Sequence, residues 1–171
     1  MGFFDKLRGK TAGETPAPAI EAKTVYAPFS GNVIPLEEMP DPVFSAGVLG
    51  PGCGIEPLEE TVYAPFNGTV TQVADSKHAI GLESEDGIEL LIHVGVDTVD
   101  MNGKGFQAFV KVGQKVHMGD KLLAFSASEI KAAGHPTTTA VLVTNADDAG
   151  TPELLSQGRM ERSAPVMKIK S

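Results

Sequence analysis

Two histidines, His78 and His93, flank the dipeptide Asp86-Gly87 at a spacing that suits a β-hairpin. Asp-Gly between two apolar stretches is a strong signal for a two-residue hairpin turn. With that turn, Ile80 faces His93 and His78 faces Gly95, so the two imidazoles become diagonal neighbours on one face. A three-residue loop would shift the register by one residue and separate them. The spacing therefore predicts a pair of adjacent imidazoles, and this prediction depends on the turn.

The two faces of the predicted hairpin differ in polarity. The histidine face also carries Ile80, Leu82 and Leu91, which form a shallow apolar surface around the two rings. Side chains of a strand alternate between faces, so the opposite face is continuously apolar, and we expect it to point into the core. Its members are Ile88, Leu90, Ile92, Val94 and Val96.

Adjacent imidazoles suit more than one kind of site. Neutral histidine is a common zinc ligand, although two ligands leave a zinc site incomplete. Alternatively, one imidazole is a nucleophile that becomes phosphorylated, and the other donates a hydrogen bond to the phosphoryl oxygens. A purely structural pair, with both rings bonded to backbone groups, is the third interpretation. The residues alone leave these alternatives open.

The elements that position the pair are built around a repeated decapeptide. Residues 24–33 (TVYAPFSGNV) recur with two changes as residues 61–70 (TVYAPFNGTV). Such a copy indicates that one supersecondary unit is used twice. Each copy is typical of a short strand that ends at proline, followed by a glycine turn and a new strand.

The remaining pattern is one of short apolar stretches separated by glycine and proline. It predicts an all-β fold, an antiparallel β-sandwich or barrel-sandwich with an internally duplicated hybrid motif and one or two short helices. A helix is expected at 127–134, and a further helical turn or two between Asn145 and Leu155. The expected strands are 24–28, 32–36, 61–65, 68–74, 78–84, 88–94, 106–111, 121–126, 139–144 and 164–169.

Composition narrows the class of protein. The net charge of −8 and the absence of a basic stripe argue against nucleic acid as a partner. A single cysteine, Cys53, excludes an internal disulfide and fits a reducing compartment. No stretch approaches the roughly 20 apolar residues of a membrane span, and no signal peptide is recognisable. We therefore expect a cytoplasmic protein.

Three segments are expected along the chain. Residues 1–10 place Phe3, Phe4 and Leu7 at helical spacing among basic residues, which suits either a peripheral contact with the inner membrane surface or a frayed terminus. Residues 11–23 are rich in proline and alanine and are typical of a linker. The folded domain is predicted to occupy residues 24–171.

At this point the chain resembles the glucose-type enzyme IIA of the bacterial phosphoenolpyruvate-dependent sugar phosphotransferase system. The segment ELLIHVGVDTV at residues 89–99 is highly specific, and it is combined with HAIGLES at 78–84. The resemblance extends to residues 26–31, 39–45, 102–106, 113–120 and 164–170. It implies a type-1 EIIA domain that acts as a phosphocarrier.

Roles at the histidine pair follow from this resemblance. It implies that His93 accepts a phosphoryl group from the phosphohistidine of HPr and passes it to a cysteine of a IIB domain, for sugar uptake. His78 would hydrogen-bond the phosphoryl group, and Ser76 would orient His78, where the family commonly has threonine. No cofactor is required, although His78 and His93 could hold zinc together with a carboxylate of a partner.

The resemblance also implies a docking surface. Asp41 and Asp97 would meet basic residues of HPr, and an apolar surface would be formed by Val43, Phe44, Val48 and Leu91. The IIB or IIBC sugar permease would be the acceptor. Regulated permeases or glycerol kinase are further partners in some relatives. The transported sugar is not readable, because sugar contacts lie on IIC.

Two other classes of protein share parts of this sequence pattern. Residues 165–169 (PVMKI) resemble the hairpin that receives biotin, but Lys168 lies three residues from the end of the printed sequence, and we expect it in a final core strand. LytM-type zinc peptidases share a duplicated architecture, but they need a third ligand and a His-x-His pair that this chain lacks. His117 and His135 are expected to be solvated loop residues.

Overall fold

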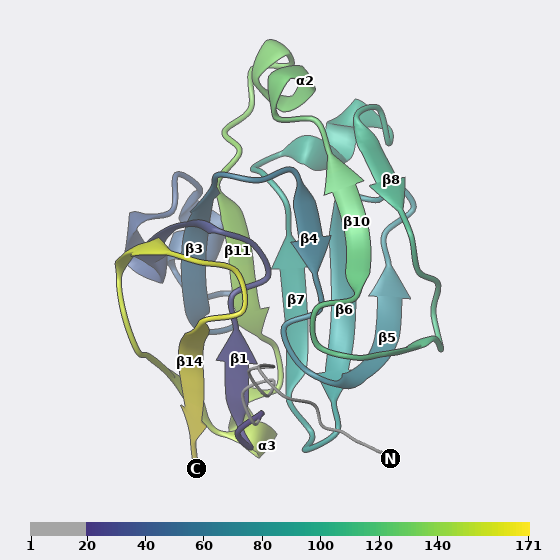
Figure 1. The fold of residues 1–171 in the computed structure, drawn as a ribbon. Coiled ribbons are helices and arrows are strands. Elements are labelled where there is room, and N and C mark those ends of the chain that lie inside the picture. The colour runs from purple at the N-terminus through teal and green to yellow at the C-terminus, as the bar shows by residue number, and fades with distance from the viewer. Residues whose placement is uncertain (1–19) are drawn as a thin grey trace, which may run out of the picture.

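The computed structural model describes residues 20–171, which form two layers of antiparallel strands with few helices. Figure 1 shows the front layer, with β14, β1, β4 and β10, lying over the back layer of β3, β11, β7, β6 and β5. The predicted antiparallel sandwich is confirmed. The predicted segments 1–10 and most of 11–23 lie outside the described residues.

The back layer is one sheet of eight strands in the order β13-β2-β3-β11-β7-β6-β5-β9. His93 is the last residue of β7 and His78 immediately precedes β6, so both lie at the same end of these two strands. Helix α2 (Ala127–Ala132) is at the top of the view in Figure 1. The strands of this sheet are β2 (Gly31–Pro35), β3 (Gly52–Pro57), β5 (Gly68–Val73), β6 (Ala79–Ser84), β7 (Glu89–His93), β9 (Lys115–Val116), β11 (Thr139–Val143) and β13 (Gly158–Met160).

The front layer consists of two sheets of three strands each, in the orders β1-β14-β12 and β4-β10-β8. Short helices connect the layers or cover the outer face of the large sheet. The front strands are β1 (Thr24–Tyr26), β4 (Thr61–Tyr63), β8 (Phe106–Ala108), β10 (Lys121–Phe125), β12 (Thr151–Leu154) and β14 (Pro165–Lys170). The remaining helices are α1 (Pro42–Ser45), α3 (Ala146–Ala149) and the 3-10 helices η1 (Leu36–Glu38) and η2 (Thr98–Met101).

The internal duplication joins the two front sheets. Tyr26 of the first copy donates its backbone N–H to the carbonyl of Pro65 at 3.0 Å, and Tyr63 of the second copy donates to Pro28 at 2.8 Å. The next residue of each copy, Ala27 or Ala64, donates in the same way to Ala164 or Asp120. The two units therefore pair through equivalent hydrogen bonds, which agrees with the predicted double use of one supersecondary unit.

Two hydrophobic clusters hold the molecule together. The larger lies between the layers and combines side chains of both, such as Val25 and Val62 in front with Ile55 and Ile92 behind. The smaller lies on the outer face of the large sheet, where η1 and α1 cover it. It contains Leu36, Met39, Phe44, Val96, Ala140 and Leu142, with Ile34 and Leu91 packed against it. The histidine pair sits at the border of this outer cluster.

The register of the β6–β7 hairpin differs from the prediction. Ala79 faces His93, Ile80 faces Ile92 and Glu83 faces Glu89, one residue away from the expected pairing. The loop has three residues, 85–87, because Ser84 N–H donates to Ile88 O and Gly87 takes the left-handed conformation that ends such a loop. The predicted two-residue turn is therefore wrong.

This register also corrects the predicted faces. Ile80 and Leu82 belong to the core between the layers, not to the histidine face. Of the set predicted to point into that core, only Val96 does not, because it lies in the outer cluster. The other four, Ile88, Leu90, Ile92 and Val94, are in the core as predicted.

Four strands escaped the prediction: β3, β9, β12 and β13. In β3, a Cβ at Gly52 would collide with the carbonyl oxygen of Val141 and one at Gly54 with the sulfur of Met39, so glycine permits close packing here. Helix α1 was also missed, whereas α2 and α3 lie near their predicted positions. Lys168 lies in β14, between β1 and β12, as expected for a final core strand.

Candidate functional site

The rings of His78 and His93 lie against each other, with centroids 4.7 Å apart and planes at 78°. The two rings meet although the loop is longer than predicted. His78 precedes β6, so the alternation of side chains between the two faces of that strand does not determine the direction of its ring. Lys77, just before it, takes a left-handed φ of 59°, which redirects the chain. His93 is the last residue of β7, so both rings lie where regular strand structure ends.

Two aromatic rings flank the histidine pair. The ring of Phe44 packs edge-on to His93 with centroids 4.9 Å apart, and Phe106 lies 6.5 Å from His78. Phe44 was predicted as part of an exposed docking surface, but it is 6% exposed and belongs to the outer cluster. Phe44 therefore packs beneath the ring of His93, inside the outer cluster. The sequence did not reveal helix α1, which directs Phe44 into that cluster.

The tautomer of His93 follows from one hydrogen bond. Nδ1 of His93 lies 2.9 Å from the carbonyl oxygen of Gly95. A carbonyl can only accept, so Nδ1 must carry the proton and donate. In the neutral imidazole, Nε2 then keeps its lone pair and is free to act as a nucleophile or ligand.

Glycine at position 95 is required by its surroundings. Its φ is +76°, and a Cβ would lie 2.5 Å from Cγ2 of Thr98 and 3.0 Å from the carbonyl oxygen of Pro136. Only glycine combines this backbone conformation with this close approach at low cost. In the predicted hairpin Gly95 is only the residue that faces His78, and the sequence pattern does not reveal that its carbonyl is the partner of His93.

Both imidazoles are held neutral. Burial, followed by the neighbouring His93, lowers the pKa of His78 from 6.5 to about 4. Burial also lowers the pKa of His93, and the bond to Gly95 together with Asp41 and Asp97 offsets part of this effect. Near neutral pH the pair therefore carries no charge, and each ring has one lone pair and one N–H.

His78 has an unsatisfied nitrogen. Its Nδ1 is the one buried side-chain nitrogen or oxygen without a hydrogen-bond partner among residues 20–171. Ser76 was predicted to orient His78, but its hydroxyl donates to the carbonyl of Val99 at 3.3 Å instead. Ser76 thus ties the segment before His78 to η2, and its hydroxyl does not hydrogen-bond the ring of His78 among the described residues.

Two carboxylates lie near His93, as predicted. Oδ1 of Asp41 caps the start of α1 by accepting from the N–H groups of Val43 at 2.8 Å and Phe44 at 3.0 Å. Asp97 is exposed and takes a left-handed φ of 61° just before η2. Both raise the pKa of His93, so both lie within electrostatic reach of its ring.

Apolar side chains surround this acidic site at the surface. Val43 is 47% exposed and Val48 is 71% exposed, whereas Leu91 is half-buried against the outer cluster. Val99 in η2 is 56% exposed, and its carbonyl accepts the hydrogen bond from Ser76. The sequence did not indicate Val99 as part of this apolar surface, and only its exposure in the structure points to it.

The other two histidines make contacts of their own, with aspartates. His117 is exposed, as predicted, with 85% of its side chain accessible. His135 was expected to be solvated, but its side chain is only 13% accessible, and Nε2 lies 2.7 Å from Oδ1 of Asp100. Among the residues described, no three metal-ligating side chains come together.

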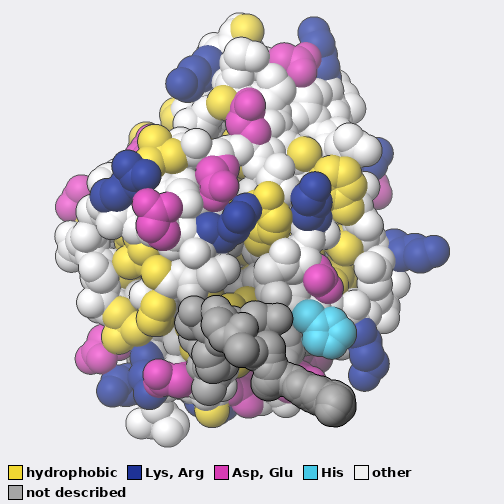
Figure 2. Space-filling model, viewed as in Figure 1, with side chains coloured by type: hydrophobic (Ala, Val, Ile, Leu, Met, Phe, Trp, Pro, Cys, Tyr) yellow, Lys and Arg dark blue, Asp and Glu magenta, His cyan; other side chains and the backbone are white. Residues whose placement is uncertain are grey.

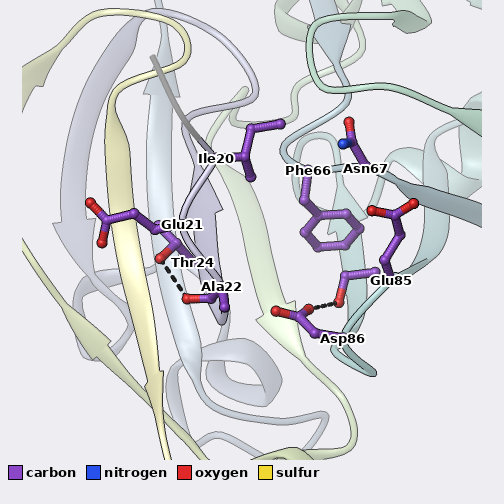
Figure 3. A pocket seen from close by; sticks show the side chains of 9 residues that line it. Ile20, Glu21, Ala22, Thr24, Phe66, Asn67, Glu85 and Asp86 are labelled. Atoms are coloured by element: carbon purple, nitrogen blue, oxygen red, sulfur yellow. Dashed lines mark hydrogen bonds between the residues drawn. The ribbon is translucent and has the colours of Figure 1, made fainter.

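A separate hollow of about 300 Å³ lies beside the β6–β7 turn (Figure 3). Thr24, Phe66, Glu85 and Asp86 are among its lining residues. Oδ2 of Asp86 accepts from the N–H of Lys23 at 2.5 Å, and Oδ1 accepts from the hydroxyl of Ser84 at 2.5 Å. Asp86, which lines the hollow, therefore anchors the backbone at Lys23 to the β6–β7 turn. The hollow lies at the opposite end of β6 and β7 from the histidines.

The general surface is mixed in charge. Figure 2 shows Lys and Arg side chains interspersed with Asp and Glu over the described part of the face formed by the front layer. No helix in the described part of the chain has both the length and the apolar character needed to cross a membrane.

Comparison with known proteins identifies the family. The profile of the phosphoenolpyruvate-dependent sugar phosphotransferase system family EIIA 1 matches residues 23–149. The glucose-specific EIIA component of Halalkalibacterium halodurans is 42% identical over 148 residues, covering 85% of this chain and 84% of the relative. The beta-glucoside-specific EIIBCA component of Bacillus subtilis is 44% identical over 145 residues, covering 85% of this chain but 24% of the relative.

A solved structure has the same fold. Glucose permease IIA from Mycoplasma capricolum superimposes with a TM-score of 0.79 at 33% sequence identity, covering 84% of this chain and 93% of that one. The chain spans only 18% to 24% of the length of its EIIBCA and EIICBA relatives. In those relatives the matching region is thus one part of a longer polypeptide.

Proposed function

The chain belongs to the EIIA 1 family of the phosphoenolpyruvate-dependent sugar phosphotransferase system, and from this premise we propose that it carries a phosphoryl group on Nε2 of His93. The observation that supports this most directly is the hydrogen bond from Nδ1 to the carbonyl of Gly95, 2.9 Å long. It leaves Nε2 as the nitrogen with a free lone pair. His93 would take the group from the phosphohistidine of HPr and pass it to a cysteine of a IIB domain.

The lowered pKa of His93 supports nucleophilic attack. A protonated imidazole has no lone pair to offer, so attack requires the neutral ring. Because burial keeps the pKa of His93 below its usual value, the neutral form predominates near pH 7. A phosphohistidine donor already contains a labile N–P bond, so transfer needs positioning more than a metal ion or nucleotide.

His78 is proposed to stabilise the transferred group. Its Nδ1 is buried without a partner, which suits a bare lone pair better than an N–H that would go unsatisfied. The proton then resides on Nε2, where it can be donated to a phosphoryl oxygen. With the ring centroids 4.7 Å apart, one phosphoryl group on His93 would be within reach of His78.

The surface around the pair suits a protein partner. Exposed Val43, Val48 and Val99 can exclude water when a partner docks, which limits hydrolysis of the phosphohistidine. Asp41 and Asp97 can attract the basic residues proposed for HPr. The names of the EIIBCA relatives place EIIA and EIIB in one chain, which supports a IIB domain as the acceptor.

The proposal is tested by incubating the purified protein with phosphoenolpyruvate, enzyme I and HPr. We expect one acid-labile phosphate per chain, and no labelling of His93→Ala. His78→Gln should still accept phosphate but deliver it slowly to IIB. Full labelling of His93→Ala would refute the assignment of the acceptor, and rapid delivery by His78→Gln would refute the role of His78.

Zinc at the pair is a further candidate, because two neutral imidazoles supply two of the four ligands of a tetrahedral site. The described residues do not complete that set, so a carboxylate of a partner would have to contribute. Regulated permeases or glycerol kinase are the candidate partners for such a contact. Zinc titration of the protein alone should then give only weak binding.

Membrane contact through residues 1–10 stays a prediction from the sequence. Their apolar and basic residues would favour anionic lipid. Cosedimentation with vesicles of anionic phospholipid tests this, with a variant that lacks residues 1–19 as the control. Equal sedimentation of the two proteins would contradict it.

A further inference from the structure

Thr98 is a fully buried polar residue at the start of η2, one turn after His93. It is 0% exposed, and its hydroxyl donates to the carbonyl of Val94 at 2.6 Å. This bond closes the backbone between Val94 and Thr98 into a compact turn. A buried carbonyl that lost this donor would carry the cost of an unsatisfied polar group, so the turn depends on the hydroxyl.

Gly95 is enclosed by this turn. The Cγ2 methyl of Thr98 approaches it so closely that a Cβ on Gly95 would lie only 2.5 Å away. The carbonyl of Pro136 lies on another side of Gly95 and accepts a hydrogen bond from Val96 N–H at 3.1 Å. The hydrogen bond from Val96 N–H thus holds the peptide that carries the Gly95 carbonyl, while Thr98 packs against the same glycine.

That carbonyl determines which nitrogen of His93 carries the proton. A neutral imidazole has two tautomers, and a neighbouring acceptor selects the one whose N–H points toward it. If the Gly95 carbonyl turned away, Nδ1 would lose its acceptor at 2.9 Å. The tautomer with the proton on Nε2 would then become populated, and in this tautomer Nε2 has no free lone pair.

We propose that Thr98 is a positioning residue whose hydroxyl, by fixing the 94–98 turn, holds the Gly95 carbonyl against Nδ1 of His93 and keeps Nε2 unprotonated. The consequence for phosphoryl transfer rests on the proposed function. The consequence for the tautomer does not, because it concerns the unphosphorylated protein alone. The two can therefore be tested separately.

The test compares Thr98→Val, which keeps the shape but lacks the hydroxyl, with Thr98→Ser, which keeps the hydroxyl but lacks the methyl. Thr24→Val is the matched control, because Thr24 is also buried and its hydroxyl also donates to a carbonyl, that of Ala22 at 3.1 Å, in the other layer. Imidazole nitrogen NMR of histidine-labelled protein near neutral pH reports the tautomer of His93. Phosphorylation by phospho-HPr is measured in parallel.

We expect the wild type, Thr98→Ser and Thr24→Val to show a protonated Nδ1 and a bare Nε2 at His93. Thr98→Val should show a mixture of tautomers and be phosphorylated roughly two- to tenfold more slowly, the effect of losing one neutral hydrogen bond. An unchanged His93 signature in Thr98→Val, or its loss in Thr98→Ser, would overturn the proposal.

Folding is monitored in the same samples by their backbone amide spectra. Should Thr98→Val unfold, Thr98→Ala provides the second variant without the hydroxyl, and its His93 signature decides in the same way. If the wild type is never phosphorylated at His93, the proposed function is refuted. If Thr98→Val nevertheless shows the shifted tautomer, the positioning role of Thr98 still holds.

Discussion

At Gly95 any side chain would meet two neighbours at once, Thr98 and the carbonyl of Pro136. Gly95→Ala should therefore lose about 1–3 kcal/mol of unfolding free energy, from the strained φ and the collision. It should also be phosphorylated slowly, because the carbonyl that orients His93 is displaced. Urea unfolding and initial labelling rates measure the two effects.

Gly113→Ala is the matched control for that variant. Gly113 has a φ of +90° but nothing within 4 Å of its Cβ position. Its replacement should cost the backbone strain alone and leave labelling unchanged. Equal labelling by Gly95→Ala and the wild type would show that the Gly95 carbonyl does not orient His93.

The pKa of His78 makes stability depend on pH. Its folded pKa, about 4, lies below the unfolded value of 6.5, so the folded state resists protonation. The contribution to stability is complete above the unfolded pKa and is lost as the pH falls through the interval between the two values. We expect a decrease on the order of 1–3 kcal/mol in unfolding free energy between about pH 7 and pH 4.

The control is His78→Gln, which has no imidazole to protonate at this position. Its unfolding free energy should decline less over the same interval, and His93, whose pKa is also lowered, should account for part of the remaining decline. Parallel pH profiles for the variant and the wild type in urea titrations would contradict the assignment.

At the scale of elements, α1 joins the acidic and apolar parts of the site. The carboxylate of Asp41 both caps the helix and carries charge toward His93. Asp41→Asn can keep the cap but removes the charge, so it should retain stability and slow phosphorylation by HPr roughly two- to fivefold at low salt. Asp41→Ala should also lose about 1 kcal/mol of unfolding free energy.

Stopped-flow labelling at several salt concentrations distinguishes these effects. The advantage of the wild type over Asp41→Asn should shrink as salt is added, because screening weakens steering between exposed charges. Equal rates for the two proteins at low salt would contradict a role for this charge in docking.

The turn between β6 and β7 is held by hydrogen bonds to one carboxylate. Asp86 accepts hydrogen bonds from Lys23 N–H and the Ser84 hydroxyl, and Figure 3 shows the latter. Burial alone would raise the pKa of Asp86, but these hydrogen bonds outweigh it and lower the pKa. Asp86→Ala should cost about 1–2 kcal/mol of unfolding free energy near neutral pH.

Exposed Asp147 of α3 provides the control, since Asp147→Ala should change stability by less than about 0.5 kcal/mol. The pKa of Asp86 is lower in the folded protein than in the unfolded chain, so its contribution to stability is lost as the carboxylate becomes protonated. The effect of Asp86→Ala should therefore diminish as the pH falls below about 4. A constant difference down to about pH 2 would argue against the carboxylate as its source.

The same turn shows what the sequence could and could not predict. Asp86-Gly87 correctly located the hairpin, but turn type depends on the hydroxyl of Ser84, which bonds both Asp86 and Ile88 N–H and stabilises a loop of three residues. Periodicity does not reveal such local side-chain bonds. The histidines meet nonetheless, because left-handed Lys77 removes His78 from the strand pattern.

At the scale of the whole molecule, duplication was the most reliable signal. The repeated decapeptide predicted two equivalent units, and their backbones exchange equivalent hydrogen bonds. Strands such as β3 were not predictable, because Gly52 and Gly54 serve contacts with β11 and with Met39 that are distant in the sequence. Burial of Phe44 was missed for the same reason, since the packing of α1 on the outer face is a tertiary effect.

The central claim is that Nε2 of His93 is the phosphoryl acceptor, and nitrogen-resolved NMR of the phosphorylated, histidine-labelled protein tests it most directly. We predict that His93 alone is modified, with phosphorus coupled to Nε2 and the proton retained on Nδ1 toward Gly95. Coupling of phosphorus to Nδ1 of His93, or to any nitrogen of His78, would contradict the account.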